Sequence, residues 1–409
     1  MISKSKGITL NFISYNFIYF SILWMILVYL PIYLKQLHIP DEGIGLLISI
    51  FSVTTLLIAV PFGYLSDKFS PKRLVQFGIF LFLIAMVGLC FIRSFFGISL
   101  LLLIGGSGSA ISLISIYSLY YKNLGIQNRG KQFGMFLLSA HFGYSFGPLA
   151  GGYILSHFNK MSYLFIFAIF LLMALFAISA KLKDVDPIRF AIREYKDDLL
   201  RKEVLYLILI VLVMGIHFGA ERTSFSLFLR ENVGLANYQI GQIFFYLGIW
   251  IGIIALISGH IFDRKRNIIA LLSIGLLFSG TFQVLTSMTS SFKSVLPIRL
   301  LHTAGDSFVI LSYGLMVSLI FTRPRVGGNY GFIRTVMTCG IFFGAIISGF
   351  LARQFGYGNP FIFSGILLMA LSLFLWQKRE LINQLLMGSD PAWGQTLKKR
   401  NPGRKGLTP

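Results

Sequence analysis

Long apolar segments recur along the whole chain, and short polar or basic connections separate them. A helix needs about 20 apolar residues to cross a hydrocarbon core of roughly 30 Å. The pattern therefore predicts an all-α membrane protein of about twelve transmembrane helices, because helices satisfy their own backbone groups in lipid. The predicted spans are approximately 8–34, 43–66, 73–93, 97–121, 131–156, 161–181, 204–229, 238–262, 267–289, 294–321, 329–352 and 359–377.

Composition and charge agree with a chain whose main solvent is lipid. Hydrophobic residues make up 56% and charged residues 12% of the 409 residues, and the mean hydropathy is +0.76. A soluble fold cannot bury so much apolar surface, so a mainly soluble enzyme is excluded. The net charge of +21 comes from lysines and arginines that gather in alternate connections. This asymmetry predicts a multi-pass protein of the plasma (inner) membrane with both termini in the cytoplasm and no nucleic-acid partner.

Residues with catalytic or ligand-binding patterns are sparse. The sequence contains no nucleotide-binding loop, no clustered metal ligands and no nucleophile motif. Cys90 and Cys339 lie alone in separate apolar segments, which is typical of small buried hydrophobes rather than of a disulfide or a metal site. We therefore expect no enzymatic activity, no cofactor and no metal site, and we expect a monomer.

An internal repeat relates the two halves of the chain. It predicts two pseudo-symmetric bundles of about six helices each, related by an axis along the membrane normal. The expected domains are an N-terminal bundle at 1–181, a cytoplasmic linker with an amphipathic helix at 182–203, a C-terminal bundle at 204–380, and a basic, disordered cytoplasmic tail at 381–409. The matching residues are Ile44 with Ile240, Gly63 with Gly259, Asp67 with Asp263, Lys68 with Arg264, Gly134 with Gly331, Gly147 with Gly344, and Gly152 with Gly349.

The connection after the second span carries a recognisable motif, GYLSDKFSPKR. It resembles the signature of the major facilitator superfamily, although Ser70 and Pro71 depart from the usual residues. The second half repeats the motif in a shortened form, GHIFDRKRN. The matching residues are Gly63, Asp67, Lys68 and Lys72 in the first copy, and Gly259, Asp263 and Arg264 in the second.

The resemblance covers essentially the whole chain and implies the fold of that superfamily, with solute transport by alternating access. A glycine lets two helices approach closely, and an acid is stabilised at the positive N-terminus of a helix. By analogy with the family, Asp67 would contact the eleventh span near Asn329 only while the cytoplasmic side is closed. The motif would then act as a latch that holds the cytoplasmic side of the protein closed. The alternative is that the connection is basic only because it lies on the cytoplasmic side of the membrane.

The fifth span carries a second motif, GMFLLSAHFGYSFGPLAGG, whose spacing resembles the exporter motif of the superfamily. Small residues four apart give a helix a flat face for close packing, and a proline favours a bend. The resemblance implies the drug-efflux branch and proton-driven export, whereas ordinary helix packing is the alternative. The motif residues are Gly143, Gly147, Pro148, Gly151 and Gly152.

Ionisable residues inside the seventh and tenth spans form one polar stripe on each helix, since they recur three or four residues apart. Intramembrane charges are costly and mark functional sites. At 1.5 Å per residue the stripes reach similar depths, about 12 and 18 Å from the outer end. The family resemblance places both spans beside the central cavity. The stripe residues are His217, Glu221 and Arg222 in the seventh span, and Arg299, His302 and Asp306 in the tenth.

We interpret Glu221 and Asp306 as the proton-carrying acids, with Arg299, His217 and His302 adjusting their protonation and lining the cavity. A permanent ion pair between Glu221 and Arg299 that merely joins two helices is the alternative.

The first half has no acid inside a span, and Leu102 stands where many proton-coupled drug exporters carry an arginine. Its polar candidates for the cavity are Asn16, Tyr15 and Tyr117, which suit an amphipathic solute held by stacking and shape. His141 and Arg334 are secondary candidates for the cavity wall. Each of these side chains has ordinary packing as its alternative role.

The sequence thus predicts a secondary active transporter that exports a small amphipathic compound in exchange for protons. The expected partners are the small-molecule substrate, protons and the lipid bilayer. Import of a sugar or organic acid by proton symport is the second interpretation, and a membrane sensor that has lost transport is the third.

Overall fold

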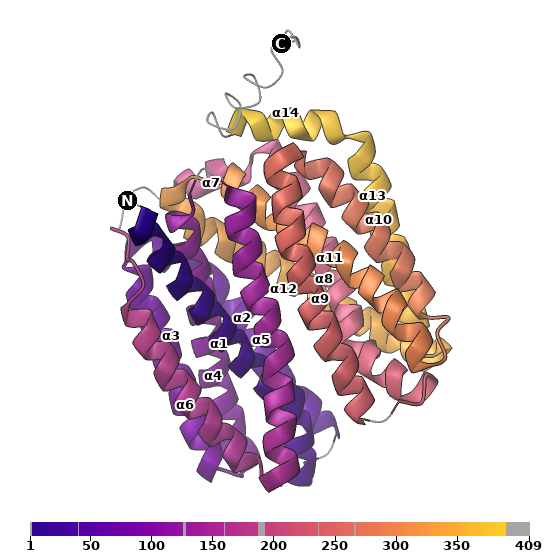
Figure 1. The fold of residues 1–409 in the computed structure, drawn as a ribbon. Helices are drawn as coiled ribbons and strands as arrows, with labels where there is room; N and C mark the ends of the chain where they lie inside the picture. The colour runs from indigo at the N-terminus through magenta and orange to yellow at the C-terminus, as the bar shows by residue number, and fades with distance from the viewer. Residues whose placement is uncertain are drawn as a thin grey trace.

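Two bundles of long helices make up the computed structural model, which describes residues 2–39, 41–125, 128–158, 160–186, 193–235, 237–265 and 267–389 (Figure 1). All of its regular elements in these ranges are helical. The first bundle contains α1 (Ile2–Gln36), α2 (Asp41–Lys68), α3 (Pro71–Phe91), α4 (Phe95–Asn123), α5 (Arg129–Phe158) and α6 (Met161–Ala180).

The second bundle repeats this order, and each predicted span coincides with one long helix. A π-helical turn, η1 (Phe228–Asn232), extends its first helix, and a short 3-10 turn, η2 (Arg323–Arg325), precedes its fifth. The long helices are α8 (Lys202–Leu227), α9 (Asn237–Lys265), α10 (Ile268–Thr286), α11 (Phe292–Ile320), α12 (Val326–Phe355) and α13 (Asn359–Gln377).

Ten helices of the described chain are long and apolar enough to cross a membrane. Helix α5 is not among these ten. It includes the glycine-rich motif and polar residues such as Gln132 and His141, so its sequence is less apolar than its neighbours. Helix α5 lies at the contact between the bundles, where neighbouring helices replace part of the lipid.

Short polar connections end one helix and cap the next. Ser70 accepts a hydrogen bond from the backbone N–H of Arg73 at 3.1 Å, and Pro71 begins α3. The two departures from the superfamily signature therefore form a strong helix start, because serine is a preferred N-cap and proline fits the first turn. Ser94, Asn267 and Ser291 cap α4, α10 and α11 in the same way.

Two short helices lie at one end of the bundles, which we call the linker end (Figure 1, top). Helix α7 (Arg193–Leu199) belongs to the linker between the halves. Helix α14 (Arg379–Ser389) extends into the segment expected to be a disordered tail, and it buries Ile382 and Leu386. The expected disorder beyond it concerns residues 390–409, which lie outside the described residues.

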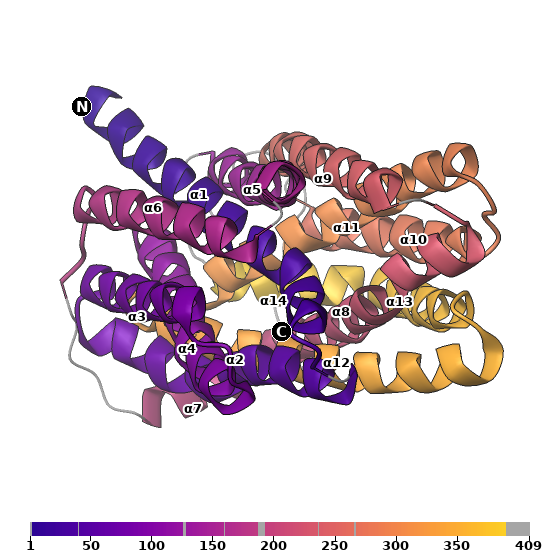
Figure 2. The same cartoon turned by 90° about the horizontal axis from the view of Figure 1, so that it is seen from below.

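The bundles meet along two helix pairs, α2 with α12 and α5 with α9 (Figure 2). A Cβ atom on Gly63 of α2 would lie 2.6 Å from the carbonyl oxygen of Gly327 and 3.1 Å from the Cα of Gly331. A Cβ atom on Gly259 of α9 would lie 2.3 Å from the carbonyl oxygen of Gly130. Glycine is therefore required at both crossings, which are equivalent positions of the repeat.

Candidate functional site

A cluster of charged side chains lies inside the second bundle, between α8 and α11. The carboxylate of Glu221 contacts the guanidinium of Arg299, and its Oε1 lies 3.0 Å from Nε2 of His302. Glu221 keeps 18% of its side chain exposed, whereas Arg299 and His302 are buried. The two stripes predicted on the seventh and tenth spans thus face each other.

Asp306 belongs to the same network. Its Oδ2 lies 3.2 Å from Nε2 of His302, and its Oδ1 lies 3.6 Å from Nε2 of His217. The hydroxyl of Ser279 on α10 donates a hydrogen bond to Asp306 Oδ1 at 2.6 Å. His302 therefore stands between the two acids and connects Glu221 with Asp306.

A third helix holds Arg299 in place. The side-chain oxygen of Gln283 on α10 accepts a hydrogen bond from Arg299 at 2.6 Å. The guanidinium also lies over the ring of Phe225, 4.2 Å from its centroid, in a favourable cation–π position. Sequence reasoning missed Ser279 and Gln283, although the two polar residues lie four apart on one face of an apolar span.

One ligand atom from each of four side chains lies within 4.8 Å of the other three; the residues are His217, Glu221, His302 and Asp306. The fold thus gathers a cluster of metal-ligating residue types that the sequence does not show. Imidazole and carboxylate groups suit several divalent metals. Arg299 already neutralises Glu221, and its charge would repel a cation at the same carboxylate. The charge of Arg299 therefore makes this cluster a poor site for a metal ion.

Asp67 joins the two bundles at the linker end. Its carboxylate accepts the backbone N–H groups of Gly327 at 3.0 Å and of Gly328 at 2.7 Å, in the first turn of α12. Lys122 of α4 lies 2.7 Å from the same carboxylate. The acid is fully buried, so both the helix N-terminus and the lysine stabilise its charge.

The linker helix α7 completes this contact. The hydroxyl of Tyr195 donates a hydrogen bond to Asp67 at 2.8 Å, and Asp198 accepts two hydrogen bonds from Arg325 at 2.8 and 3.0 Å. Burial, together with the charge of Asp67, raises the pKa of Tyr195, so the phenol keeps its proton at neutral pH. Sequence reasoning found neither Lys122 nor Tyr195, because both depend on distant segments coming together.

Asp263 makes the equivalent contact in the other half. Its two carboxylate oxygens accept the backbone N–H groups of Gly130 at 3.0 Å and of Lys131 at 2.9 Å, in the first turn of α5. Each bundle thus offers one acid to the N-terminus of a helix in the other bundle. We call these two contacts, made by Asp67 and Asp263, the paired latches.

The basic residues of the signature have other surroundings. Lys72 donates a hydrogen bond to the carbonyl of Ala180 at 2.6 Å, which ties α3 to the end of α6 in the same bundle. Lys68 lies 5.4 Å from the ring centroid of Tyr64 on its own helix. Arg264 is exposed at the end of α9. The contacts described for Lys68 and Lys72 thus remain within the first bundle.

The motif of the fifth span packs α5 against α1. Cβ atoms on Gly143 and Gly147 would lie 2.4 and 2.2 Å from the carbonyl oxygens of Phe17 and Ser21. The carbonyl of Pro148 accepts a hydrogen bond from Tyr29 at 2.8 Å. Gly151 and Gly152 face the side chain of the same tyrosine. The motif therefore has a clear packing role, whatever its bearing on transport direction.

We expect Gly147→Val to destabilise the protein by about 3 kcal/mol, because the new side chain would overlap the backbone of α1. Gly349→Val is the matched control, since Gly349 also lies inside a helix but has nothing within 4 Å of the added Cβ. Thermal unfolding of the two purified variants compares them. Equal melting temperatures would contradict the close contact of α1 and α5.

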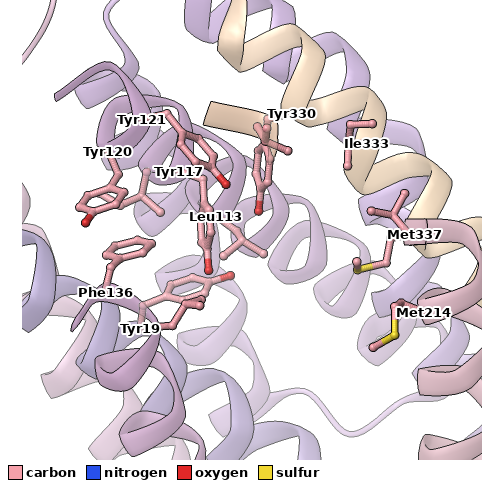
Figure 3. Packing of buried hydrophobic residues seen from close by; sticks show 14 of the residues in the cluster. Tyr19, Leu113, Tyr117, Tyr120, Tyr121, Phe136, Met214, Tyr330, Ile333 and Met337 are labelled. Atoms are coloured by element: carbon pink, nitrogen blue, oxygen red, sulfur yellow. The ribbon is translucent and has the colours of Figure 1, made fainter. Parts of the chain in front are cut away.

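The polar candidates of the first bundle divide into two groups. Tyr15 and Asn16 are fully buried and bonded within the bundle, Tyr15 to Ser112 and Asn16 to the carbonyl of Phe136 at 2.7 Å. Tyr117 instead stacks on Tyr330 of α12, with ring centroids 5.0 Å apart. Figure 3 shows Tyr117 and Tyr330 side by side, with the hydroxyl of Tyr19 close by. Among these candidates, Tyr117 is the one placed at the bundle interface.

Comparisons with known proteins indicate the same family as the sequence motifs. The sequence profile of the Major Facilitator Superfamily matches residues 12–282 and 268–400. Multidrug resistance protein 2 of Bacillus subtilis is 23% identical over 399 residues, which cover 93% of this chain and 97% of that protein. Quinolone resistance protein NorA of Staphylococcus aureus is 23% identical over 354 residues, which cover 82% and 87% of the two chains.

A solved structure has a similar fold. The human organic anion transporter MFSD10 (TETRAN) gives a TM-score of 0.77 at 15% identity, covering 90% of this chain and 99% of that one. Two bundles of membrane helices with a charged cluster inside the second bundle define a multi-pass transport protein. The profile match over most of the chain shows that it belongs to the Major Facilitator Superfamily, a family of transporters rather than enzymes. The predicted family and fold class are thus confirmed.

Proposed function

We propose that the protein exports a small amphipathic compound across the plasma membrane in exchange for protons, by alternating access. The observation that carries the proposal is the network in which His302 connects Glu221 with Asp306 while Glu221 stays partly exposed. The names of two relatives, a multidrug resistance protein and a quinolone resistance protein, agree with efflux.

The partly exposed carboxylate of Glu221 gives protons access to this network. A proton that reaches the exposed edge of Glu221 neutralises the carboxylate and weakens its contacts with Arg299 and His302. His302 then interacts mainly with Asp306. Protonation of Glu221 therefore changes the electrostatic interactions between α8 and α11. The intramembrane ion pair forms when Glu221 is ionised and is lost when Glu221 is protonated. Proton binding can therefore change the relative free energies of the two conformations of the transporter.

The paired latches are the contacts that would be formed in one conformation of the transporter and broken in the other. Both acids bind helix N-termini at the linker end, which we take as the cytoplasmic side. These contacts exist only while the bundles are closed at that end. Proton binding and release within the membrane would shift the balance between this state and one with the latches open.

A second candidate, uptake of an organic acid by proton symport, is favoured by a separate observation. Arg222 and Arg334 have no acidic partner within ion-pair distance among the described residues. If Glu221 were protonated, Arg299 would join them as a free cation, so protons and an organic anion would bind together rather than compete.

Everted membrane vesicles with an acidified interior test the proposed direction. Addition of N-phenyl-1-naphthylamine, an uncharged fluorescent dye, is expected to collapse part of the pH gradient and to concentrate the dye inside. Vesicles from cells that lack the protein provide the baseline. Proton movement only in right-side-out vesicles, on addition of an organic acid, would replace export by symport.

A further inference from the structure

Two arginines stand near the contact of the bundles without a carboxylate partner. Arg334 of α12 donates a hydrogen bond to the sulfur of Met337 at 3.4 Å, and its Nε is buried with no partner. Arg222 of α8 forms no ion pair with any acid of the described chain. Arg299, in contrast, is neutralised by Glu221. The protein thus keeps two positive charges available beside its proton network.

Tyrosines from both bundles lie close to the face of α12 that carries Arg334. Tyr330 precedes Arg334 by four residues on the same helix and stacks on Tyr117 of α4 in the first bundle, with ring centroids 5.0 Å apart. The hydroxyl ends of Tyr19, Tyr117 and Tyr330 point toward one region between the bundles (Figure 3). A cation placed among phenol groups offers hydrogen bonds and aromatic faces at the same place.

Arg222 lies on α8, which packs against α12, the helix that carries Arg334. Its side chain is exposed, and an anion bound at Arg334 would also be attracted by this second positive charge.

We propose that the transported solute carries an anionic group, a carboxylate or a sulfonate, on an aromatic body. The anion binds Arg334 with Arg222 beside it, because a guanidinium pairs with planar oxyanions through two parallel hydrogen bonds. The aromatic part lies against Tyr117 and Tyr330, which already stack on each other. This inference rests on the proposed transport function and does not depend on its direction.

The charge of the solute is tested with three probes that share one ring system: 1-naphthylacetate, 1-naphthylacetamide and 2-(1-naphthyl)ethylammonium. Their affinities for the full-length protein are measured by titration calorimetry in nanodiscs of phosphatidylcholine. We expect the anion to bind at least tenfold more tightly than the amide, and the cation to bind most weakly. Equal affinities of the anion and the amide would overturn the proposal.

Variants assign the binding to the arginines. Arg334→Gln is expected to abolish the preference for the anion, and Arg334→Lys to keep part of it, since lysine retains the charge without the planar fork. Arg222→Gln is expected to reduce the preference severalfold and serves if the Arg334 variants do not fold. Arg230→Gln is the matched control, because Arg230 is exposed in the middle of η1. An unchanged preference in Arg334→Gln and Arg222→Gln would overturn the proposal.

Anionic lipid offers the same chemistry from a different source. If phosphatidylglycerol in the nanodisc displaces the probe in proportion to its content, the arginines hold a lipid headgroup and the solute proposal fails. Transport keeps the two proposals distinct. If the uncharged dye N-phenyl-1-naphthylamine still dissipates a pH gradient while the naphthyl anion binds no more tightly than the amide, the anion inference fails and proton-coupled export stands. If no compound moves protons but the anion binds through Arg334, proton-coupled export fails and the anion inference stands.

Discussion

Everted vesicles that contain the Glu221→Gln variant are expected to lose substrate-dependent proton movement by at least about tenfold, equivalent to ~1.4 kcal/mol or more. Glutamine keeps a hydrogen-bonding oxygen for Arg299 but has no proton to exchange and no charge to balance the guanidinium. Asp306→Asn is expected to act in the same direction, because His302 contacts both acids. The measurement is the collapse of a preset pH gradient after addition of dye.

Glu231→Gln is the control for this experiment. Glu231 lies on η1, about three helical turns after Glu221 in the sequence, and its side chain is 56% exposed in a weak contact with Arg230. We expect it to transport normally. If Glu221→Gln and Asp306→Asn both still couple dye movement to the pH gradient, the acids join helices and do not carry protons.

Asp67→Asn is expected to reduce transport by about tenfold or more while the protein still inserts and folds. The substitution removes the charge that binds the N-terminus of α12 and Lys122. Hydrogen bonds to a charged group contribute about 1.5–3 kcal/mol. Loss of ~2 kcal/mol from one state changes its population ratio by up to about 30-fold. Initial transport rates, normalised to the amount of protein in the membrane, measure the effect.

Two further variants test the latch explanation. Asp263→Asn is expected to impair transport in the same way, because Asp263 binds the N-terminus of α5 through the same kind of contact. Asp197→Asn, at an exposed position of α7, is expected to leave transport unchanged. Normal kinetics in the double variant of Asp67 and Asp263 would remove the paired latches from the mechanism.

The positions of the membrane helices could be read from the sequence because lipid imposes one simple requirement. A spanning segment must be apolar over about 20 residues and must satisfy its backbone internally. The same reasoning located the stripes that contain Glu221 and Asp306, since the 3.6-residue period fixes which residues share a helix face. The internal repeat indicated that Asp67 and Asp263 occupy equivalent positions.

The partners of these residues depended on tertiary structure. The helical period does not determine which neighbouring helix a stripe faces, because that depends on how distant helices pack. Only the fold brought Ser279 and Gln283 to the charged cluster. Only the fold placed Tyr195 against Asp67.

The sequence by itself therefore determined the positions of the membrane helices, the two related bundles and the faces that carry charge. Tertiary structure decided which charges are neutralised and which are not. It paired Arg299 with Glu221 and left Arg222 and Arg334 without a carboxylate. The physical reason is that the cost of a charge inside the membrane depends on groups a few ångströms away in space, and these come from helices far apart in the chain.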